Sequence, residues 1–325
     1  YAETLSPDFY SPNTKNWLYF GWENDASKSL TTMGGAMYPG GANGSRNGHI
    51  QPIRYTVTVD GAEYLPDETS PQRRQNTKWY QADGYMNSPV SEWAAGDTGI
   101  TVKIQHVANR VLEDSATVVF TQVTLSNTAN VDKQVELNIS ASSAVEVPLA
   151  TNPILQGEEF AIYRQTVPSG KDIKLDFAAT ATGSATVEQL KGLGDFQTQY
   201  TAVKAYYDGM LNRFARPVSL PDDEMVNSYL NSMIVMWETM VQVSHGDYEI
   251  RGDAGNRCGV YNYDRYFSHD VPNMVEQFIR DGYIDLAKRI MESSYYQRLA
   301  YNPQQGYLDA IPKYIIPYAT LWQVI

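Results

Sequence analysis

Polar and aromatic side chains are densest between Arg251 and Asp270, in a stretch that precedes a helical pattern. Carboxylates accept paired hydrogen bonds from sugar hydroxyls, and aromatic rings cover the apolar C–H faces of sugars. The stretch therefore predicts a saccharide-binding loop. A structural alternative stays open, in which Asp270 caps the helix that begins at Val271 and Asp264 pairs with Arg265. The predicted sugar contacts are Asp264, Arg265, Asp270, Tyr261 and Tyr263.

Cleavage of a glycosidic bond needs two carboxyl groups, one protonated as the acid and one ionised as the base or nucleophile. The sequence assigns these two catalytic roles to no particular residue. Trp237, near the end of an apolar helical pattern, is a further candidate for stacking on a sugar ring. Asp309 is a second-tier sugar contact, for which a turn residue is the simpler interpretation.

Other classes of chemistry find little support. The formal net charge of −12 disfavours a nucleic-acid partner, because a phosphate backbone attracts basic proteins. The single cysteine, Cys258, excludes a cysteine-cluster metal site, and the four histidines lack the spacing of paired metal ligands. No glycine-rich phosphate loop follows a predicted strand, and no apolar run reaches the roughly 20 residues of a transmembrane helix. We therefore expect no metal, no cofactor and no transmembrane segment.

The elements that must position the loop fall into two kinds. Up to about Ala179, apolar and polar residues alternate with the period of two that is typical of strands, and short polar turns separate the runs. Residues 1–183 are therefore predicted to form an antiparallel β-sandwich. Within it, the glycine-rich stretch from Met33 to Asn47 is predicted to be a surface loop.

Helical periodicity follows. Residues 184–219 are predicted to form a linker helix, from Val187 to Phe214, and residues 220–325 the first hairpins of a helical domain. The first of these helices opens near Ser219, and further helices cover about 270–281 and 283–300. The apolar stripe of the helix that opens near Ser219 comprises Met225, Tyr229, Met233, Met236 and Met240. The apolar end of the chain, Thr320 to Ile325, is typical of a helix that continues, so we expect the sequence to be a fragment.

Several motifs occur in the order found in a known superfamily. The linker-helix letters from Ala205 to Leu211, followed by Val218-Ser-Leu-Pro-Asp222, are similar to the domain junction of the six-hairpin glycosidases. The stretch from Tyr261 to Phe267 is similar to the Trp-Asp-x-x-Phe element of trehalase-like members. The letters Phe267-Ser-His-Asp270, with Gly282 twelve residues later, resemble the Arg-Asp element of glucoamylase-like and debranching-enzyme-like members.

The resemblance carries implications for fold and mechanism. Its members place a large β-sandwich, or supersandwich, ahead of an (α/α)6 toroid, and the disaccharide-phosphorylase-like members share this layout. The aspartate that matches Asp270 holds the sugar at the cleavage subsite, whereas the acid and base come from later hairpins. By this resemblance the chain lacks most of the toroid and both proton-transfer carboxylates. It would be inactive alone, and could assemble with a missing C-terminal part or another chain.

Two functions are therefore weighed. The first is a carbohydrate-active enzyme that cleaves glycosidic bonds in an oligo- or polysaccharide, as an inverting glycoside hydrolase or as a phosphorylase. The second is a non-catalytic β-sandwich protein of the cell surface or extracellular space that binds glycans or proteins. The 24 tyrosines, against 9 phenylalanines, suit half-wet surfaces in either case. The chain begins at Tyr1 without Met, and an extracellular or periplasmic location is expected.

Overall fold

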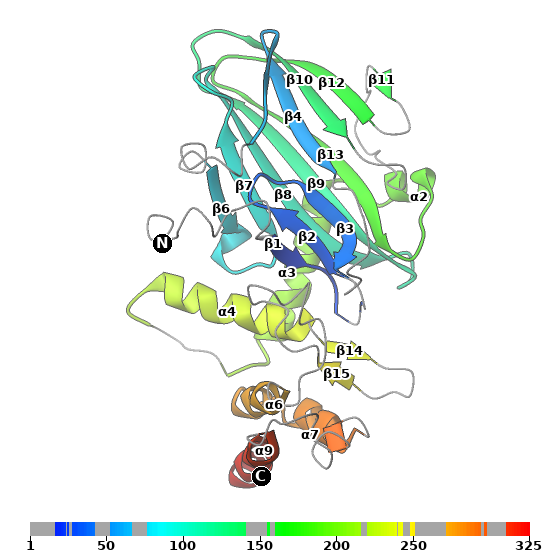
Figure 1. The fold of residues 1–325 in the computed structure, drawn as a ribbon, viewed down its shortest axis with the longest axis vertical. Helices are drawn as coiled ribbons and strands as arrows, with labels where there is room; N and C mark the ends of the chain where they lie inside the picture. Colours follow the sequence, from blue (N-terminus) through cyan, green and yellow to red (C-terminus); the bar gives the residue numbers. More distant parts are fainter. Residues whose placement is uncertain are drawn as a thin grey trace.

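The structure is a computed structural model with its secondary structure and packing defined for part of the chain. It describes residues 17–23, 25, 28–42, 53–66, 77–140, 155–156, 160–215, 220–238, 240–242, 248–250, 271–293, 296–297 and 310–325. Antiparallel strands occupy the first half of the chain and helices most of the second, as the periodicity predicts (Figure 1). The β part and the helices follow one another along the longest axis, and the C-terminus lies at the helical end.

The strands form three antiparallel sheets and one hairpin in the described ranges. A small sheet has the order β1-β2-β3, two five-stranded sheets have the orders β11-β12-β10-β4-β5 and β13-β9-β8-β7-β6, and β14 pairs with β15. The strands are β1 (Trp17–Phe20), β2 (Lys28–Thr32), β3 (Met37–Ala42), β4 (Arg54–Val59), β5 (Ala62–Tyr64), β6 (Thr77–Gln81), β7 (Pro89–Ala94), β8 (Ile100–Val111), β9 (Ala116–Asn127), β10 (Lys133–Ser140), β11 (Leu155–Gln156), β12 (Phe160–Val167), β13 (Asp172–Thr182), β14 (Met240–Gln242) and β15 (Tyr248–Ile250).

The two five-stranded sheets pack face to face around an apolar core. Buried residues alternate along β4 and along the first half of β8, so that one face of each sheet is apolar. Across the interface, the rings of Tyr163 on β12 and Phe177 on β13 meet edge to face with centroids 5.5 Å apart. Tyr55 on β4 lies 6.3 Å from Phe177. The alternation in the sequence thus correctly predicts a sandwich of antiparallel sheets.

The prediction of a surface loop from Met33 to Asn47 is wrong over residues 37–42, which form β3. Met37 is buried and bridges Ile53, and Gly40 is buried against β13. Gly40 has a φ of +59°, and a Cβ built there would lie 2.2 Å from the carbonyl oxygen of Ala181. The glycines that suggested a loop instead permit close approach of two backbones.

Gly40→Ala is expected to destabilise the fold clearly more than Gly61→Ala. Both positions have positive φ, which costs an alanine about 1–2 kcal/mol, but nothing lies within 4 Å of a Cβ at Gly61. The clash with Ala181 adds an overpacking cost of about 1–3 kcal/mol at position 40 only. Urea unfolding of the two variants measures the difference, and equal losses would contradict the proposed close approach.

The helical elements are shorter than the periodicity predicts. They are α2 (Val187–Gly192), α3 (Phe196–Leu211), α4 (Asp223–Glu238), α6 (Val271–Arg280), α7 (Ile284–Glu292) and α9 (Ala310–Val324), with a 3-10 turn η3 (Ala82–Gly84) before β7. The predicted single helix from Val187 to Phe214 is two helices, because Gly194 has a φ of +90° and Asp195 caps a new helix through a 2.8 Å bond from the Thr198 N–H.

The helix α4 also departs from its prediction at both ends. It begins at Asp223, where the Asp222 side chain accepts a 2.8 Å hydrogen bond from the Glu224 N–H, rather than near Ser219. It ends at Glu238, and Met240 belongs to β14 instead of the apolar stripe. Within the stripe, Met233 is buried but Met225 is exposed.

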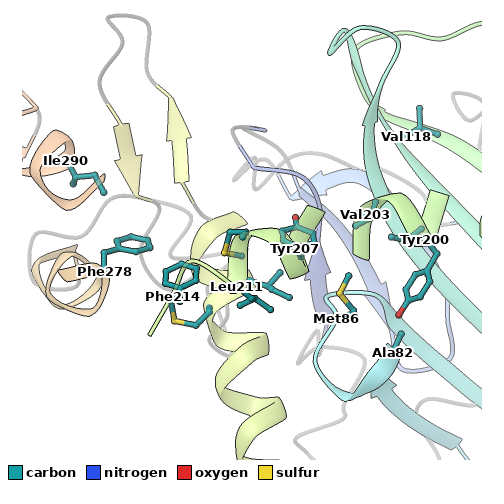
Figure 2. Close-up of a cluster of buried hydrophobic side chains, with 14 of the residues drawn as sticks. Ala82, Met86, Val118, Tyr200, Val203, Tyr207, Leu211, Phe214, Phe278 and Ile290 are labelled. Atoms are coloured by element: carbon teal, nitrogen blue, oxygen red, sulfur yellow. The ribbon is translucent and has the colours of Figure 1, made fainter. Parts of the chain in front are cut away.

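A second core joins the sandwich to the helices. The helix α3 lies against the outer face of β8 and β9, where Val107, Phe120, Val203 and Tyr207 are buried in one cluster. The same cluster continues through Phe214 into Phe278 on α6 and Ile290 on α7 (Figure 2). The buried apolar residues therefore run without interruption from the β-sheets into the helices. Every helix of the described ranges is too short or too polar to span a lipid bilayer.

Candidate functional site

The predicted sugar-binding loop lies between elements that the structure places. Five predicted contacts lie within 251–270, outside the described residues: Asp264, Arg265, Asp270, Tyr261 and Tyr263. Asp309 also lies outside the described residues. The loop is entered from α4 through the β14–β15 hairpin and leads into α6 at Val271. Val271, Val275, Phe278 and Ile279 form the buried face of α6.

Trp237, the remaining predicted sugar contact, is half-buried near the C-terminal end of α4. Its indole N–H donates a hydrogen bond to Glu23 in the β1–β2 connection. Its ring meets Phe214 edge to face at 6.3 Å and Tyr283 at 5.4 Å. The structure thus brings Trp237 to a carboxylate and two aromatic rings, and its stacking on a sugar stays a prediction.

Tyr283 extends this contact to α6 and α7. Its ring lies 3.6 Å from Phe214 and 6.4 Å from Phe278, by ring centroids. Its hydroxyl donates a 2.6 Å hydrogen bond to the carbonyl of Met210, in the last turn of α3. Phe214 and Phe278 belong to one buried cluster (Figure 2). One aromatic group therefore holds the ends of α3 and α4 together with the turn between α6 and α7.

Glu238, the residue after Trp237, is fully buried. Its Oε1 accepts a 2.8 Å hydrogen bond from the Tyr207 hydroxyl, and its Oε2 accepts one from the Asn87 side-chain amide. Burial raises the pKa of Glu238 to about 8, against the lowering effects of Lys28, Tyr207 and Asn87. The nearby Glu23 raises this pKa further. At neutral pH this carboxyl group is therefore mostly protonated.

Glu23 is half-buried, close to Lys28 and Glu238. Burial raises its pKa, whereas a hydrogen bond with Tyr206 and the charge of Lys28 lower it. The ring of the neighbouring Trp22 packs on Tyr206, with ring centroids 4.6 Å apart. The backbone carbonyl of Trp22 accepts a hydrogen bond from the Lys28 ammonium. We call this group the junction cluster, which comprises Trp22, Glu23, Lys28, Asn87, Tyr206, Tyr207, Trp237 and Glu238.

The β1–β2 connection that carries Glu23 is anchored at Asp25. Its carboxylate accepts hydrogen bonds from Arg110 Nη1 at 2.7 Å, Thr117 Oγ1 at 2.5 Å and Thr182 Oγ1 at 3.3 Å. Arg110 also donates to the carbonyl of Asp114, which closes the β8–β9 turn. Asp25 is only 5% exposed, so these buried hydrogen bonds, one of them from a charged donor, fix the connection to β8, β9 and β13.

The buried part of the junction cluster, Glu238 with Asn87 and Tyr207, suits proton retention and positioning rather than contact with a substrate. Glu238 and Asn87 are buried, and every polar group described above has a partner within the protein. Among the residues that the structure describes, no three His, Cys, Asp or Glu side chains are placed to hold a metal ion. The cluster therefore joins the β-sheets to the helices.

Sequence reasoning missed Glu23 and Glu238. Each follows a tryptophan directly, in the pairs Trp22-Glu23 and Trp237-Glu238. Glu238 also lies four residues after Ile234, on the buried face of α4. A carboxylate on the apolar stripe of a helix is a signal that could have identified it.

The sequence matches no model of a known protein family and no curated protein. Among solved structures, the chain is similar to a bacterial glucoamylase in complex with acarbose, with a TM-score of 0.54 and 14% sequence identity. The similarity concerns the fold. The likeness covers 93% of this chain and 55% of the glucoamylase, so the chain spans about half the length of that protein. At the level of fold, this agrees with the resemblance to six-hairpin glycosidases.

Proposed function

We propose that the chain is part of a carbohydrate-active enzyme that cleaves glycosidic bonds as an inverting glycoside hydrolase. The observation that carries the proposal is the likeness in fold, over 93% of the chain, to a glucoamylase solved with the carbohydrate acarbose. An oligo- or polysaccharide is the proposed substrate. The two-carboxyl chemistry of such an enzyme needs neither a metal nor a cofactor. An extracellular or periplasmic location stays a prediction.

The proposal includes a division of the chain into a sandwich (1–183), a linker (184–219) and the start of an (α/α)6 toroid (220–325). Support comes from the surface of α9. Its Tyr314 and Thr320 are buried, and Thr320 lies 3.5 Å from Glu276 of α6, but Ile315, Ile316 and Trp322 are exposed. A helix that is apolar on nearly all sides belongs inside a larger helical assembly. Further helices, on a longer chain or another chain, would cover these residues.

In this proposal Asp270 and Asp264 bind the reacting sugar, together with Arg265, Tyr261 and Tyr263, while Trp237 borders the site. Glu238 is not offered as the acid or base, because a side chain with no exposed surface does not reach a substrate. The proton-transfer carboxylates would come from helical hairpins beyond α9, as in the family that the sequence resembles.

A sugar-binding measurement tests the proposal on this chain. Thermal unfolding is followed with acarbose and with a panel of α- and β-linked disaccharides and oligosaccharides. A sugar that binds only the folded chain, present at a concentration 100 times its Kd, raises the free energy of unfolding by about 2.7 kcal/mol. We expect at least one sugar to raise the Tm of the wild type and of Asp172→Ala, an exposed aspartate of β13, but not of Asp270→Ala.

The outcomes separate the alternatives. Stabilisation by no sugar would reject a sugar site in this chain, and equal stabilisation of Asp270→Ala would reject the role of that residue. A longer chain that binds the same sugar but releases no reducing end, with or without phosphate, would favour the non-catalytic glycan-binding alternative. Cleavage only with phosphate present would favour phosphorolysis over hydrolysis.

A further inference from the structure

Glu238 lies where three separate parts of the chain meet. Its carboxyl group belongs to the last residue of α4, and Oε1 accepts a 2.8 Å hydrogen bond from Tyr207 on α3. Oε2 accepts a hydrogen bond from Asn87, which precedes β7 of the sandwich. All three side chains are buried, with exposed fractions of at most 5%. The contact between α4 and the sandwich therefore includes a carboxyl group that water does not reach.

Titratable side chains from other parts of the described chain surround this carboxyl group. Lys28 on β2 attracts its negative charge, Glu23 in the β1–β2 connection repels it, and Tyr207 on α3 donates a hydrogen bond to it. Tyr206 on α3 is hydrogen-bonded to Glu23. Lys28 is 8% exposed, and its charge also stabilises the ionised form of Glu23. One buried ammonium group thus acts on two carboxyl groups.

The positive charge of Lys28 balances one negative charge and no more. Glu23 is half-buried and accepts hydrogen bonds from the Trp237 indole and the Tyr206 hydroxyl, which favour its ionised form. Glu238 has no exposed surface, and burial raises its pKa to about 8. At neutral pH the three groups therefore carry no net charge. Ionisation of Glu238 adds a second negative charge in a buried place, which is costly unless the group reaches water.

We infer that the junction cluster is a pH-sensitive switch, in which ionisation of Glu238 separates the end of α4 from Asn87 and Tyr207 while the sandwich stays folded. Movement of α4 brings the carboxylate into water and removes the cost of its burial. In the open form Glu238 titrates near its ordinary pKa of 4.5, whereas in the closed form its pKa is about 8. Between these two values the population of the open form rises about tenfold for each pH unit. The switch needs no sugar, so its failure and the failure of the proposed function are separate results.

Backbone hydrogen exchange tests the opening. Exchange of α4 and β9 peptides is measured from pH 5 to 9 in the wild type and in Glu238→Gln, whose side chain does not ionise. The ratio of the two rates at each pH removes the intrinsic pH dependence of exchange. We expect the ratio for α4 to rise about tenfold per pH unit up to about pH 8 and then to level off. Low urea concentrations should accelerate exchange of β9 much more than that of α4, because a local opening exposes less surface than global unfolding does.

The outcomes and the control are distinct. A ratio for α4 that does not change with pH would overturn the switch. Equal rates with equal urea dependence in α4 and β9 would also overturn it, since both elements would then exchange only through global unfolding. Glu136→Gln, which removes a charge from the ion pair with Arg164 between β10 and β12, is the matched control and should follow the wild type.

Two further variants test the charge balance in opposite directions, and each is compared with the same variant that also carries Glu238→Gln. Glu23→Gln removes the repelling charge and keeps an acceptor for Trp237, so the ratio should level off at a lower pH than in the wild type. Lys28→Met keeps an aliphatic stem and removes the ammonium group, so the ratio should level off at a higher pH. No shift, or shifts in the same direction, would overturn the roles of Lys28 and Glu23. If Lys28→Met does not fold, the direction of the shift in Glu23→Gln decides.

Discussion

Replacing Glu238 by Gln should abolish a loss of stability of about 5 kcal/mol that the wild type suffers as the pH rises from 4.5 to about 8. The folded pKa of Glu238 is raised from 4.5 to about 8 by burial. Each pH unit of that difference corresponds to about 1.4 kcal/mol. Glutamine has the shape of the protonated acid but does not ionise. The variant therefore keeps a neutral side chain at position 238 at every pH.

The sign follows from proton binding in the two states. Below pH 4.5 the carboxyl group is protonated in both the folded and the unfolded chain, so it contributes no pH dependence to the free energy of unfolding. Between 4.5 and about 8 the unfolded chain releases the proton while the folded chain retains it, so the free energy of unfolding falls as the pH rises. Above about 8 both states are ionised and the loss is complete.

Urea unfolding of the wild type and of Glu238→Gln from pH 4 to 9 measures this effect. The difference in unfolding free energy should be small at pH 4, grow through pH 6 and level off near pH 9, with the variant the more stable. Glu188→Gln, in the exposed first turn of α2, provides a matched change of charge and should run parallel to the wild type. A pH-independent difference between Glu238→Gln and the wild type would show that this carboxyl group is ionised in the folded protein.

The second large effect is expected for Tyr207→Ala. The Tyr207 ring is 1% exposed and packs against Trp22 and Tyr206, with centroids 5.9 Å and 5.2 Å away. Loss of a buried aromatic ring costs about 3–5 kcal/mol. The variant also removes a donor from the buried Glu238, which costs about 1–3 kcal/mol more. Guanidinium unfolding at pH 6 should show a loss of at least about 4 kcal/mol.

Tyr207→Phe separates the two contributions. It keeps the ring and loses only the hydrogen bond, so the expected loss is about 1–3 kcal/mol. Since that hydrogen bond lowers the pKa of Glu238, the pH at which stability levels off should move upward in this variant. Losses of equal size in the two variants would mean that the ring contributes little packing, contrary to its burial.

Local patterns predicted the elements whose residues follow one period. The first half of β8 alternates between core and outer positions. The strand β9 is buried at nearly all positions, because α3 covers its outer face. Several apolar residues of α3, including Val203 and Leu211, are buried, as the helical periodicity requires. These elements form because one face must leave water, and that requirement is written in the spacing of apolar residues.

Tertiary contacts decided the rest. The strand β3 was missed because its glycines serve an approach to Ala181, a residue 141 positions after Gly40, which no local pattern encodes. The break between α2 and α3 depends on a single positive φ at Gly194. The pairing of Glu23 with Trp237 was missed for a similar reason. The Glu23 carboxylate and the Trp237 indole N–H form a hydrogen bond only when two segments that are distant in the sequence meet. The predicted loop from Arg251 to Asp270 rests on local chemistry and stays a prediction.

The bond between Glu23 and Trp237 joins residues 214 positions apart. A ribosome that adds about 5–20 residues per second completes α4 about 10–40 s after it has made β1 and β2. For most of that interval the nascent chain has strands but lacks α3, whose Tyr206 packs on Trp22. Trp22 and Glu23 are therefore synthesised long before their partners on α3 and α4. Helper proteins that bind exposed aromatic side chains would meet this chain at the β1–β2 connection during translation.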